Sequence, residues 1–522
     1  MTTVVATVAI ADLLDRLAVV DDRGIRCGDT SLSWREHLVE ARRWARTLRA
    51  RLDPGRPPHV AVLLENTPAF ATVLSAASLD GLVVVGLNTT RRGAALSRDM
   101  TVADCAMVLV EPSTAALLDG VDTAGIPVVD VTSPDWLTEV AAQDVVAAPP
   151  SRRPAPDDLF MLIFTSGTSG DPKAVRCDHA KVTTAGVMLA DRFGLGADDV
   201  VYLSMPMFHS NAIIAGWGVA VAAGASVALR PRFSASGFID DVRRHGVTYA
   251  NYVGKPLTYV LATPASPDDA DNPLRIVYGN EASPGDIAAF SERFDVRVVD
   301  GFGSTEGGVA IGRTPDTPPE ALGPLVAPVA VLDPETGLPC PPAEFDADGR
   351  LLNPDEAVGE IVNLSGPGAF TGYHNDPAAD AERMRGGIYH SGDLAYVDHD
   401  GFVYFAGRMG DWVRVDGENV GTGPIERILL RHPGIRLASV YGVGTDIGDE
   451  IVASLVTDSL SAHELSSFLA LQSDLGPKQW PRHVCVVDEL PTTATFKVLR
   501  RSLAASTPEP TWTLDPAART YR

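Results

Sequence analysis

A loop rich in glycine and hydroxyl side chains carries the clearest chemical signal in the sequence. Residues 162–173 read Leu-Ile-Phe-Thr-Ser-Gly-Thr-Ser-Gly-Asp-Pro-Lys, so an apolar segment enters the loop and Lys173 closes it. Glycines let backbone N–H groups approach phosphate oxygens, hydroxyls add donors, and the lysine adds positive charge. The spacing differs from the Walker motif, Gly-x-x-x-x-Gly-Lys-Ser/Thr. The apolar lead-in favours a phosphate site over a merely flexible loop, formed by Thr165, Ser166, Gly167, Thr168, Ser169, Gly170 and Lys173.

Lysine is scarce in this chain, and its positions are therefore informative. Lysine and arginine together number 43, but lysine occurs only at positions 173, 181, 255, 478 and 497. A lysine kept in such an arginine-rich background indicates a need for a compact ammonium group. Lys497 ends a second polar segment, Thr-Thr-Ala-Thr-Phe-Lys, near the C-terminus. A solvated surface lysine is the ordinary alternative for that position.

Further polar segments follow the first loop along the chain. Residues 279–281 read Gly-Asn-Glu, and residues 301–306 read Gly-Phe-Gly-Ser-Thr-Glu. Asp393 in Ser-Gly-Asp precedes Arg408 in Phe-Ala-Gly-Arg. A carboxylate accepts hydrogen bonds from two neighbouring hydroxyls, and a guanidinium supplies a fork of donors. His209 ends the segment Met-Pro-Met-Phe-His. Taken singly, these segments are also compatible with surface turns, a structural ion pair and a core histidine.

The order of these segments resembles the adenylate-forming superfamily of acyl-CoA ligases, nonribosomal adenylation domains and luciferases. The resemblance covers nearly the whole chain and implies that ATP is cleaved at its α-phosphate. It implies that Glu306 holds Mg²⁺, a cation that favours carboxylate and phosphate oxygens, and that Lys497 stabilises charge developing in the transition state. The catalytic residues it implies are Lys497, Thr305, Glu306 and His209. Beyond the first loop, the ATP- and AMP-binding residues it implies are Gly279, Asn280, Glu281, Gly301, Phe302, Gly303, Ser304, Thr305, Asp393, Arg408 and Lys497.

Within this superfamily, the chain is most similar to the very-long-chain fatty-acid-CoA ligase and fatty-acid transport branch. Residues 278–281 and 404–420 are close to that branch's patterns. Many superfamily members have an Asp or Lys hinge where this chain has Gly410. Glycine absorbs large changes of backbone dihedral angle, so we expect a hinge there. The resemblance places the substrate pocket and the coenzyme A path at His209, Asn211, Trp217, Lys255, Gly417, Glu418 and Asn419.

Alternating strands and helices are expected to position these segments. Helical patterns occupy residues 34–51 and 237–245, and strand patterns recur at 59–64, 82–86, 159–164, 200–205, 226–229, 247–252, 275–278 and 296–299. Such alternation predicts an α/β fold. We expect a large N-terminal domain, residues 1–409, with α/β sheets and a small β-subdomain that bind ATP and substrate. A smaller mobile α+β domain, residues 410–522, would begin with a helix capped by Thr422 and would carry Lys497.

Composition argues against several classes of function. The formal net charge of −24 disfavours nucleic acid and anionic membranes as partners. The five scattered cysteines form no Cys-x-x-Cys pair, which argues against a zinc site or a disulfide framework. The apolar stretch 212–229 is rich in Ala, Gly and Val, so we interpret it as a buried helix and strand. We expect a cytoplasmic protein with small-molecule substrates and no integral membrane segment; its oligomeric state is not predicted.

The predicted function is that of an acyl-CoA ligase. It would convert a fatty or aryl acid, ATP and coenzyme A into acyl-CoA, AMP and pyrophosphate through an acyl-AMP intermediate. Its C-terminal domain would rotate between the two half-reactions. Two alternatives share the first step: a diazotase that activates nitrite for attack by an aromatic amine, and a stand-alone adenylation enzyme that loads a carrier protein in trans. A non-catalytic scaffold is disfavoured because none of the key charged residues is lost.

Overall fold

The chain divides into two compact units. The first comprises Met1–Asp300, Ser304–Gly307 and Ala369–Ala381, and the second comprises Gly301–Gly303, Gly308–Gly368 and Glu382–Arg522. The computed structural model describes residues 7–145, 151–165, 172–346, 351–409, 412–415, 418–445, 448–457, 459–472, 475–493, 498–516 and 518–522. The domain boundary expected near residue 409 falls inside the second unit and stays a prediction.

One sheet of the first unit leads to the predicted phosphate loop. Its strand order is β6-β5-β3-β4-β7-β8, and only the β7–β8 pair is antiparallel. The strands are β3 (His59–Leu63), β4 (Val83–Gly86), β5 (Met107–Val110), β6 (Val128–Asp130), β7 (Leu159–Thr165) and β8 (Lys173–Asp178). The continuous apolar sequences of β3, β4 and β5 are buried along their whole length, as expected for parallel strands covered on both faces.

A second sheet of the first unit carries the segments expected to contact adenine and substrate. Its order is β13-β12-β11-β9-β10-β1-β2, and only β2 in this series is antiparallel to its neighbour. Its strands are β1 (Gly24–Cys27), β2 (Thr30–Ser33), β9 (Val200–Leu203), β10 (Ser226–Leu229), β11 (Tyr249–Val253), β12 (Ile276–Asn280) and β13 (Arg297–Gly303), of which residues 297–300 belong to this unit. The strands predicted in this region are confirmed, with ends shifted by a few residues.

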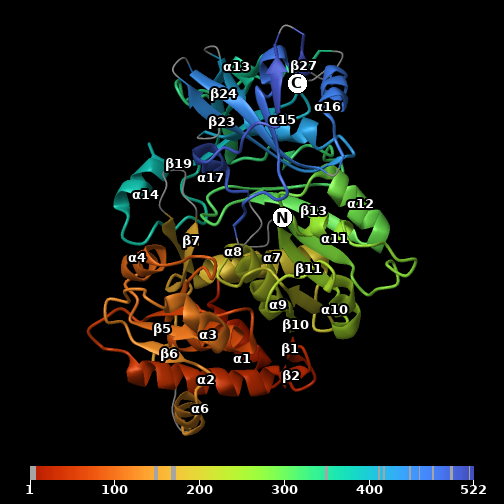
Figure 1. The fold of residues 1–522 in the computed structure, drawn as a ribbon. Coiled ribbons are helices and arrows are strands. Elements are labelled where there is room, and N and C mark those ends of the chain that lie inside the picture. Colours follow the sequence, from red (N-terminus) through yellow and green to blue (C-terminus); the bar gives the residue numbers. More distant parts are fainter. Residues whose placement is uncertain are drawn as a thin grey trace. The chain divides into compact units, whose positions relative to one another are not determined.

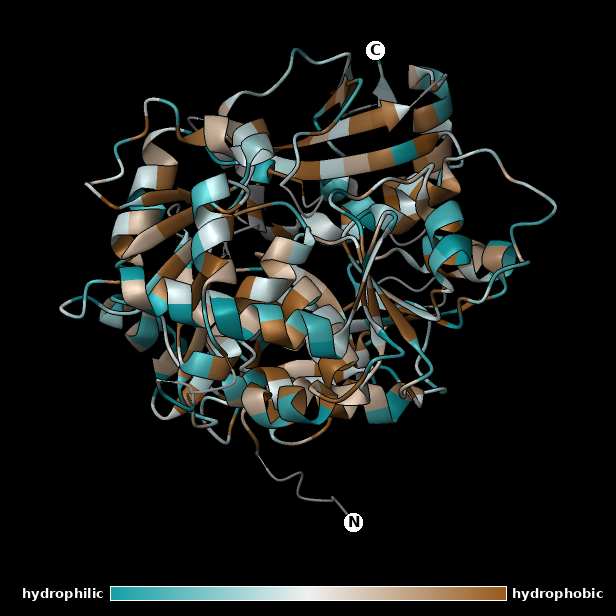
Figure 2. Ribbon diagram, turned by 90° about the horizontal axis from the view of Figure 1, so that it is seen from below, coloured by the Kyte–Doolittle hydropathy of each residue, from teal (hydrophilic) through white to brown (hydrophobic). Residues whose placement is uncertain are grey.

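Helices lie along both sheets of the first unit (Figure 1). They are α1 (Ile10–Leu17), α2 (Trp34–Arg51), α3 (Pro68–Asp80), α4 (Ala94–Val102), α5 (Pro112–Ala115), α6 (Pro134–Ala141), α7 (His179–Phe193), α8 (Ser210–Ala212), α9 (Gly218–Ala223), α10 (Phe238–His245), α11 (Pro256–Leu261) and α12 (Pro284–Phe294). Hydrophilic and hydrophobic stretches alternate along the helices, while the strands are largely hydrophobic (Figure 2). Helix α2 spans the predicted residues because Ser33 and Glu36 form a capping box at its start.

The apolar stretch 212–229 forms a helix and a strand, as expected. The helix contains one irregular turn: Ile213–Trp217 is a π-helix between α8 and α9, and β10 follows. Periodicity in a short sequence of small apolar residues does not reveal such a turn, and π-turns are frequent at functional sites. Among the residues that the structure describes, no helix is both long and apolar enough to cross a membrane.

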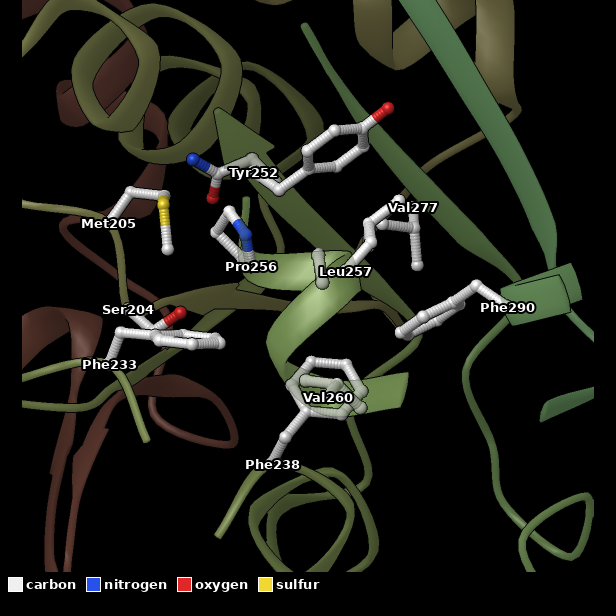
Figure 3. A pocket seen from close by; sticks show the side chains of 12 residues that line it. Ser204, Met205, Phe233, Phe238, Tyr252, Pro256, Leu257, Val260, Val277 and Phe290 are labelled. Atoms are coloured by element: carbon white, nitrogen blue, oxygen red, sulfur yellow. The ribbon is translucent and has the colours of Figure 1, made fainter. Parts of the chain in front are cut away.

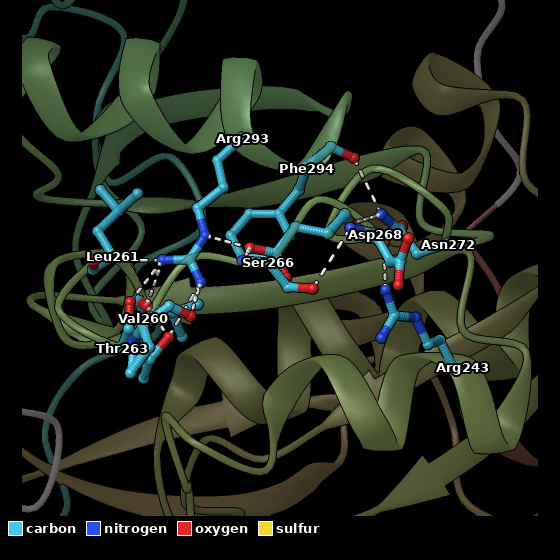
Figure 4. A network of polar contacts seen from close by, with 11 residues as sticks. Arg243, Val260, Leu261, Thr263, Ser266, Asp268, Asn272, Arg293 and Phe294 are labelled. Atoms are coloured by element: carbon cyan, nitrogen blue, oxygen red, sulfur yellow. Dashed lines mark hydrogen bonds and ion pairs between the residues drawn. The ribbon is translucent and has the colours of Figure 1, made fainter.

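Arg293 of α12 fixes the connection that follows α11 (Figure 4). Its Nη1 donates to the carbonyl oxygens of Val260, Leu261 and Thr263 at 3.2, 3.2 and 3.0 Å. Its Nε donates to Asp269 Oδ2 at 2.7 Å, and both side chains are largely buried. The Arg293 guanidinium therefore supplies hydrogen bonds to carbonyl groups at the C-terminus of α11, and the Asp269 carboxylate neutralises its charge.

The described residues of the second unit form two sheets and a short hairpin. The strands β15 (Gly323–Pro324), β16 (Val329–Leu332), β17 (Gly359–Asn363), β19 (Ile388–Val397) and β20 (Phe402–Arg408) have the order β15-β20-β19-β17-β16, with β18 (Met384–Arg385) beside β19. β14 (Ala310–Gly312) pairs with Gly301–Gly303. The hairpin is β21 (Trp412–Val415) and β22 (Glu418–Gly421). The last sheet joins β23 (Ile435–Thr445), β24 (Gly448–Thr457), β25 (His483–Val486), β26 (Trp512–Asp515) and β27 (Thr520–Tyr521) in that order.

The remaining helices include one correction to the sequence prediction. They are α13 (Pro354–Ala357), α14 (Pro377–Arg383), α15 (Thr422–Leu429), α16 (Ala462–Ala470) and α17 (Arg500–Ala505). Thr422 is the first residue of α15 rather than its N-cap, which is Gly421 in an extended conformation. The prediction was wrong by one residue: Thr is a favoured cap, but glycine is also accepted at an N-cap, and here Gly421 has the extended backbone of that position.

The fold buries a histidine whose protonation opposes folding. His37 of α2 is fully buried, and its Nε2 lies 2.8 Å from Ser75 Oγ of α3. Burial lowers the pKa of His37 to about 4 from an ordinary 6.5. Between these values the unfolded chain binds a proton that the folded chain does not, so stability falls as pH decreases from 6.5 toward 4. The loss approaches about 1.4 kcal/mol per pH unit.

His37→Gln is expected to make the unfolding free energy less sensitive to acid in this pH range. Urea denaturation at pH 7.5 and pH 5 measures the change, with exposed His463→Gln as the matched control. The wild type and the control should lose more stability on acidification than the His37 variant. An equal loss in all three proteins would contradict the assignment.

Candidate active site

The predicted phosphate loop joins two paired strands. Thr165, at the end of β7, lies opposite Lys173, at the start of β8. Backbone hydrogen bonds of the hairpin therefore fix the two residues that bracket the loop. Five predicted phosphate-binding residues between them lie outside the described residues, so their role stays a prediction; they are Ser166, Gly167, Thr168, Ser169 and Gly170.

Glu306 is held on two sides in the first unit. Its side chain is buried, and its Oε1 accepts a hydrogen bond of 3.0 Å from the Tyr373 hydroxyl. Its backbone carbonyl accepts a hydrogen bond of 2.8 Å from Lys181 Nζ. Burial lowers the pKa of the Lys181 ammonium, while nearby groups including Glu306 oppose that shift. Lys173 Nζ lies 5.3 Å from the centroid of the Tyr373 ring. The structure thus brings together the two charges that the sequence predicted for binding phosphate and metal.

Thr305 contacts the segment that follows His209. The hydroxyl oxygens of Thr305 and Ser210 are 2.7 Å apart. His209 precedes α8, and its ring lies 5.0 Å from that of Phe208. Ser210 had not been selected from the sequence, but it follows the predicted His209 directly.

Asn211 connects α8 to strand β11. Its Nδ2 donates to the carbonyl of Tyr252 at 2.9 Å, and its Oδ1 accepts from Asn251 Nδ2 at 2.5 Å. The Tyr252 hydroxyl in turn donates to Asp300 Oδ1 at 2.6 Å, and Asp300 is the last residue of β13 that belongs to the first unit. These bonds tie the carboxyl ends of two strands to the segment after His209. Ligands bind at such strand ends in open α/β sheets.

The predicted adenine segment ends strand β12. Gly279 lies so close to β11 that an added Cβ would be 2.2 Å from the carbonyl oxygen of Tyr252. Asn280 accepts a backbone hydrogen bond from Gly254, and Glu281 has a positive φ of 71°. The close approach of β11 thus requires glycine at position 279, and the left-handed turn after β12 is made by Glu281.

A small cavity lies beneath the carboxyl end of β11 (Figure 3). It is lined mainly by aromatic and aliphatic side chains of α10, α11 and α12 and the neighbouring strands, with Ser204 and Asn251 as polar members. Residues 213–221 do not line it. Trp217 is fully buried and stacks on Phe160 at 5.9 Å. Lys255 immediately precedes α11.

Asp393 and Arg408 form an ion pair in the second unit. They face each other across the β19–β20 pair, with Arg408 Nε 3.2 Å from Asp393 Oδ1. Phe302 lies in the same unit, with its ring 6.0 Å from that of Phe405 on β20. The bend before Asp393 is held by buried Glu360, whose Oε1 accepts from the Gly392 N–H at 2.9 Å.

Several predicted residues give no side-chain geometry. Gly410, Gly417 and Lys497 lie outside the described residues. Glu418 and Asn419 belong to β22, whose backbone pairs with β21. In the described part of the chain, no three or more His, Cys, Asp or Glu side chains are grouped to hold a metal. A metal held mainly by one carboxylate and by phosphate would not require such a group.

Sequence reasoning missed Tyr373, Lys181, Ser210 and Glu360. The rarity of lysine in this chain could have drawn attention to Lys181, but its position in the sequence does not indicate a role. Tyr373 and Glu360 had none, because their partners are distant in the sequence or are backbone atoms.

Two family models of AMP-binding enzymes match this chain. The AMP-binding enzyme model matches residues 8–374, and the AMP-binding enzyme C-terminal domain model matches residues 424–497. The chain therefore belongs to the AMP-binding enzyme family, and the predicted superfamily and α/β fold are confirmed.

Its relatives include named ligases. The chain is 56% identical to the medium/long-chain-fatty-acid–CoA ligase FadD17 of Mycobacterium marinum, over 95% of this chain and 96% of the relative. It is 44% identical to the steroid-22-oyl-CoA synthetase of Rhodococcus jostii, over 94% and 89%. ATP-bound MatB from Rhodopseudomonas palustris has a similar structure, with 25% identity, a TM-score of 0.81 and coverage of 96% and 99%.

Proposed function

We propose that the protein is an ATP-dependent, AMP-forming acyl-CoA ligase for medium- or long-chain fatty acids or related large apolar acids. The observation that carries this proposal is the 56% identity to a medium/long-chain-fatty-acid–CoA ligase along nearly the whole of both chains. The similarity to a steroid-22-oyl-CoA synthetase extends the class of acids that deserve testing. The grouping of Lys173, Tyr373 and Glu306 supports the ATP half of the reaction.

In the proposed first half-reaction, a carboxylate oxygen attacks the α-phosphorus of ATP. The bond from that phosphorus to the bridging oxygen breaks, and pyrophosphate leaves. We assign the phosphates to the loop 165–173 and Thr305, and the ribose hydroxyls to Asp393 and Arg408. The assigned contacts to adenine are Gly279, Asn280, Glu281, Gly301, Phe302, Gly303 and Ser304. Lys497 would stabilise the negative charge that develops during the step.

Mg²⁺ fits the donors at Glu306. The buried Glu306 carboxylate offers hard oxygen ligands, which Mg²⁺ prefers. When bound, the ion would neutralise phosphate charge and favour departure of pyrophosphate. Tyr373 and Lys181 would hold Glu306 in place for that contact.

In the proposed second half-reaction, the coenzyme A thiolate attacks the acyl carbonyl carbon and AMP leaves. We assign a hinge to Gly410, which would let the C-terminal segment withdraw Lys497 between the steps. Residues assigned to the acid and coenzyme A path are His209, Asn211, Trp217, Lys255, Gly417, Glu418 and Asn419.

A product screen by mass spectrometry tests the proposal. Purified protein, ATP and Mg²⁺ are supplied with fatty or steroid acids plus coenzyme A, with nitrite plus aryl amines, or with acids plus a phosphopantetheinylated carrier protein. We expect AMP and acyl-CoA in the first set only. AMP release confined to the nitrite set would establish a diazotase instead, and acylation of the carrier without acyl-CoA formation would establish a loading enzyme.

A further inference from the structure

We propose that Tyr373 is a positioning residue that orients the Glu306 carboxylate for Mg²⁺-bound ATP through its hydroxyl, while its ring contacts the Lys173 ammonium. The inference rests on the proposed function only in taking ATP as the ligand. It is carried by contacts within the first unit, between residues that are far apart in the sequence.

The backbone around Tyr373 is fixed to the strand that begins with Lys173. Tyr373 forms a bridge with Val175 of β8. On either side of it, Arg176 N–H donates to the Gly372 carbonyl at 3.0 Å, and His374 N–H donates to the Ala174 carbonyl at 2.8 Å. The position of the tyrosine ring is therefore set by the same hairpin that brackets the phosphate loop.

The far side of this segment is anchored as well. The Tyr373 N–H donates to Asp380 Oδ1 at 2.7 Å. His374 Nε2 and Asn375 Nδ2 lie 3.0 and 2.8 Å from Asp104 Oδ2. Several independent backbone and side-chain contacts thus fix the position of Tyr373. A residue that positions another side chain must itself be held in this way.

The side chain of Tyr373 contacts both charges with different parts. Its hydroxyl donates to Glu306 Oε1 at 3.0 Å, a hydrogen bond strengthened by the acceptor's charge. Its ring lies 5.3 Å from Lys173 Nζ, which favours the ammonium electrostatically. Tyr373 therefore fixes the direction of the Glu306 carboxylate through its hydroxyl and contacts the Lys173 ammonium through its ring.

The turn at Glu306 has little freedom in other respects. Lys181 Nζ holds its carbonyl, and Gly307 has a φ of 72°. A Cβ at Gly307 would lie 3.1 Å from Lys181 Cε and 3.3 Å from the Ala369 Cβ. The backbone of Glu306 is thus fixed independently of Tyr373. Removing the tyrosine hydroxyl should alter mainly the direction of the carboxylate.

Calorimetric titration with ATP, in excess Mg²⁺ and in EDTA, separates these roles. Tyr373→Phe keeps the ring but loses the hydroxyl, and is expected to weaken ATP binding about tenfold in Mg²⁺ and little in EDTA. Tyr373→Leu loses both contacts, so its binding should weaken in EDTA as well. The matched control is Tyr202→Phe, which removes another hydroxyl-to-carboxylate bond, to Asp241 at 2.7 Å, away from the proposed site.

Unchanged binding by Tyr373→Phe, or an equal loss with and without Mg²⁺, would overturn the inference, because a merely structural role predicts no selective loss. If Tyr373→Leu fails to fold, Tyr373→Phe alone decides. No acid or coenzyme A enters the titration, so failure of the acyl-CoA ligase proposal would leave this test interpretable. Conversely, an active ligase whose Tyr373→Phe variant keeps normal Mg²⁺-dependent binding would refute only the role of Tyr373.

Discussion

Lys497→Ala is expected to slow adenylate formation by about 100- to 1000-fold, the usual cost of removing one donor aimed at charge developing in a transition state. The reason lies in the proposed chemistry, where negative charge grows on the α-phosphate oxygens as pyrophosphate leaves. A lysine can place a compact ammonium at that point, whereas the planar guanidinium of arginine requires a different geometry. Lys497→Arg should therefore recover little of the lost rate.

Two assays separate this role from a general loss of structure. Pyrophosphate–ATP exchange in the presence of an accepted acid measures the first half-reaction. Thioester formation from a supplied acyl-adenylate and coenzyme A measures the second, which should be nearly unchanged. Lys478→Ala is the matched control, since it removes the other lysine of the C-terminal segment. Normal exchange by the Lys497 variant would refute the catalytic assignment, and equal losses in both assays would point to misfolding.

Elements with strong local signals were predictable from the sequence. Helix α2 follows its predicted bounds because a capping box starts it and its apolar positions recur at helical spacing. Buried strands such as β3 and β10 were recognisable as short apolar sequences. The π-turn at Ile213–Trp217 was not predictable, because an extra residue in one turn depends on packing around the helix rather than on its own composition.

Site residues were predictable where they belong to short sequence segments of recognisable chemistry that occur in the expected order along the chain. Asp393 and Arg408 were paired from the sequence, and the structure shows them opposite each other on adjacent strands. Tyr373 was not found, because it meets Glu306 across 67 residues of chain. Lys181 meets Glu306 across 125 residues. Residues that position a charge are selected by tertiary contacts, and a lone tyrosine or lysine gives little local indication of them.

Asp393→Ala is expected to raise the KM for ATP by about 10- to 100-fold, because hydrogen bonds to a charged group contribute roughly 1.5–3 kcal/mol. The geometry favours a large effect. The Asp393 side chain is only 10% exposed, its bend is held by Glu360, and its loss removes the carboxylate facing Arg408. The maximal rate should fall less, since ribose contacts are made equally in the ground state and the transition state.

The nucleotide itself provides the decisive control for Asp393. If the carboxylate binds both ribose hydroxyls, the wild type should prefer ATP to 2′-deoxy-ATP and 3′-deoxy-ATP, and the Asp393→Ala variant should lose most of that preference. A general disturbance of the β19–β20 pair would instead weaken all three nucleotides alike and keep the preference. Asp400→Ala, an exposed carboxylate in the connection between the same strands, should behave as the wild type. Because the test compares nucleotides within one variant, partial loss of stability cannot imitate the expected result, and retained discrimination would remove Asp393 from the ribose site.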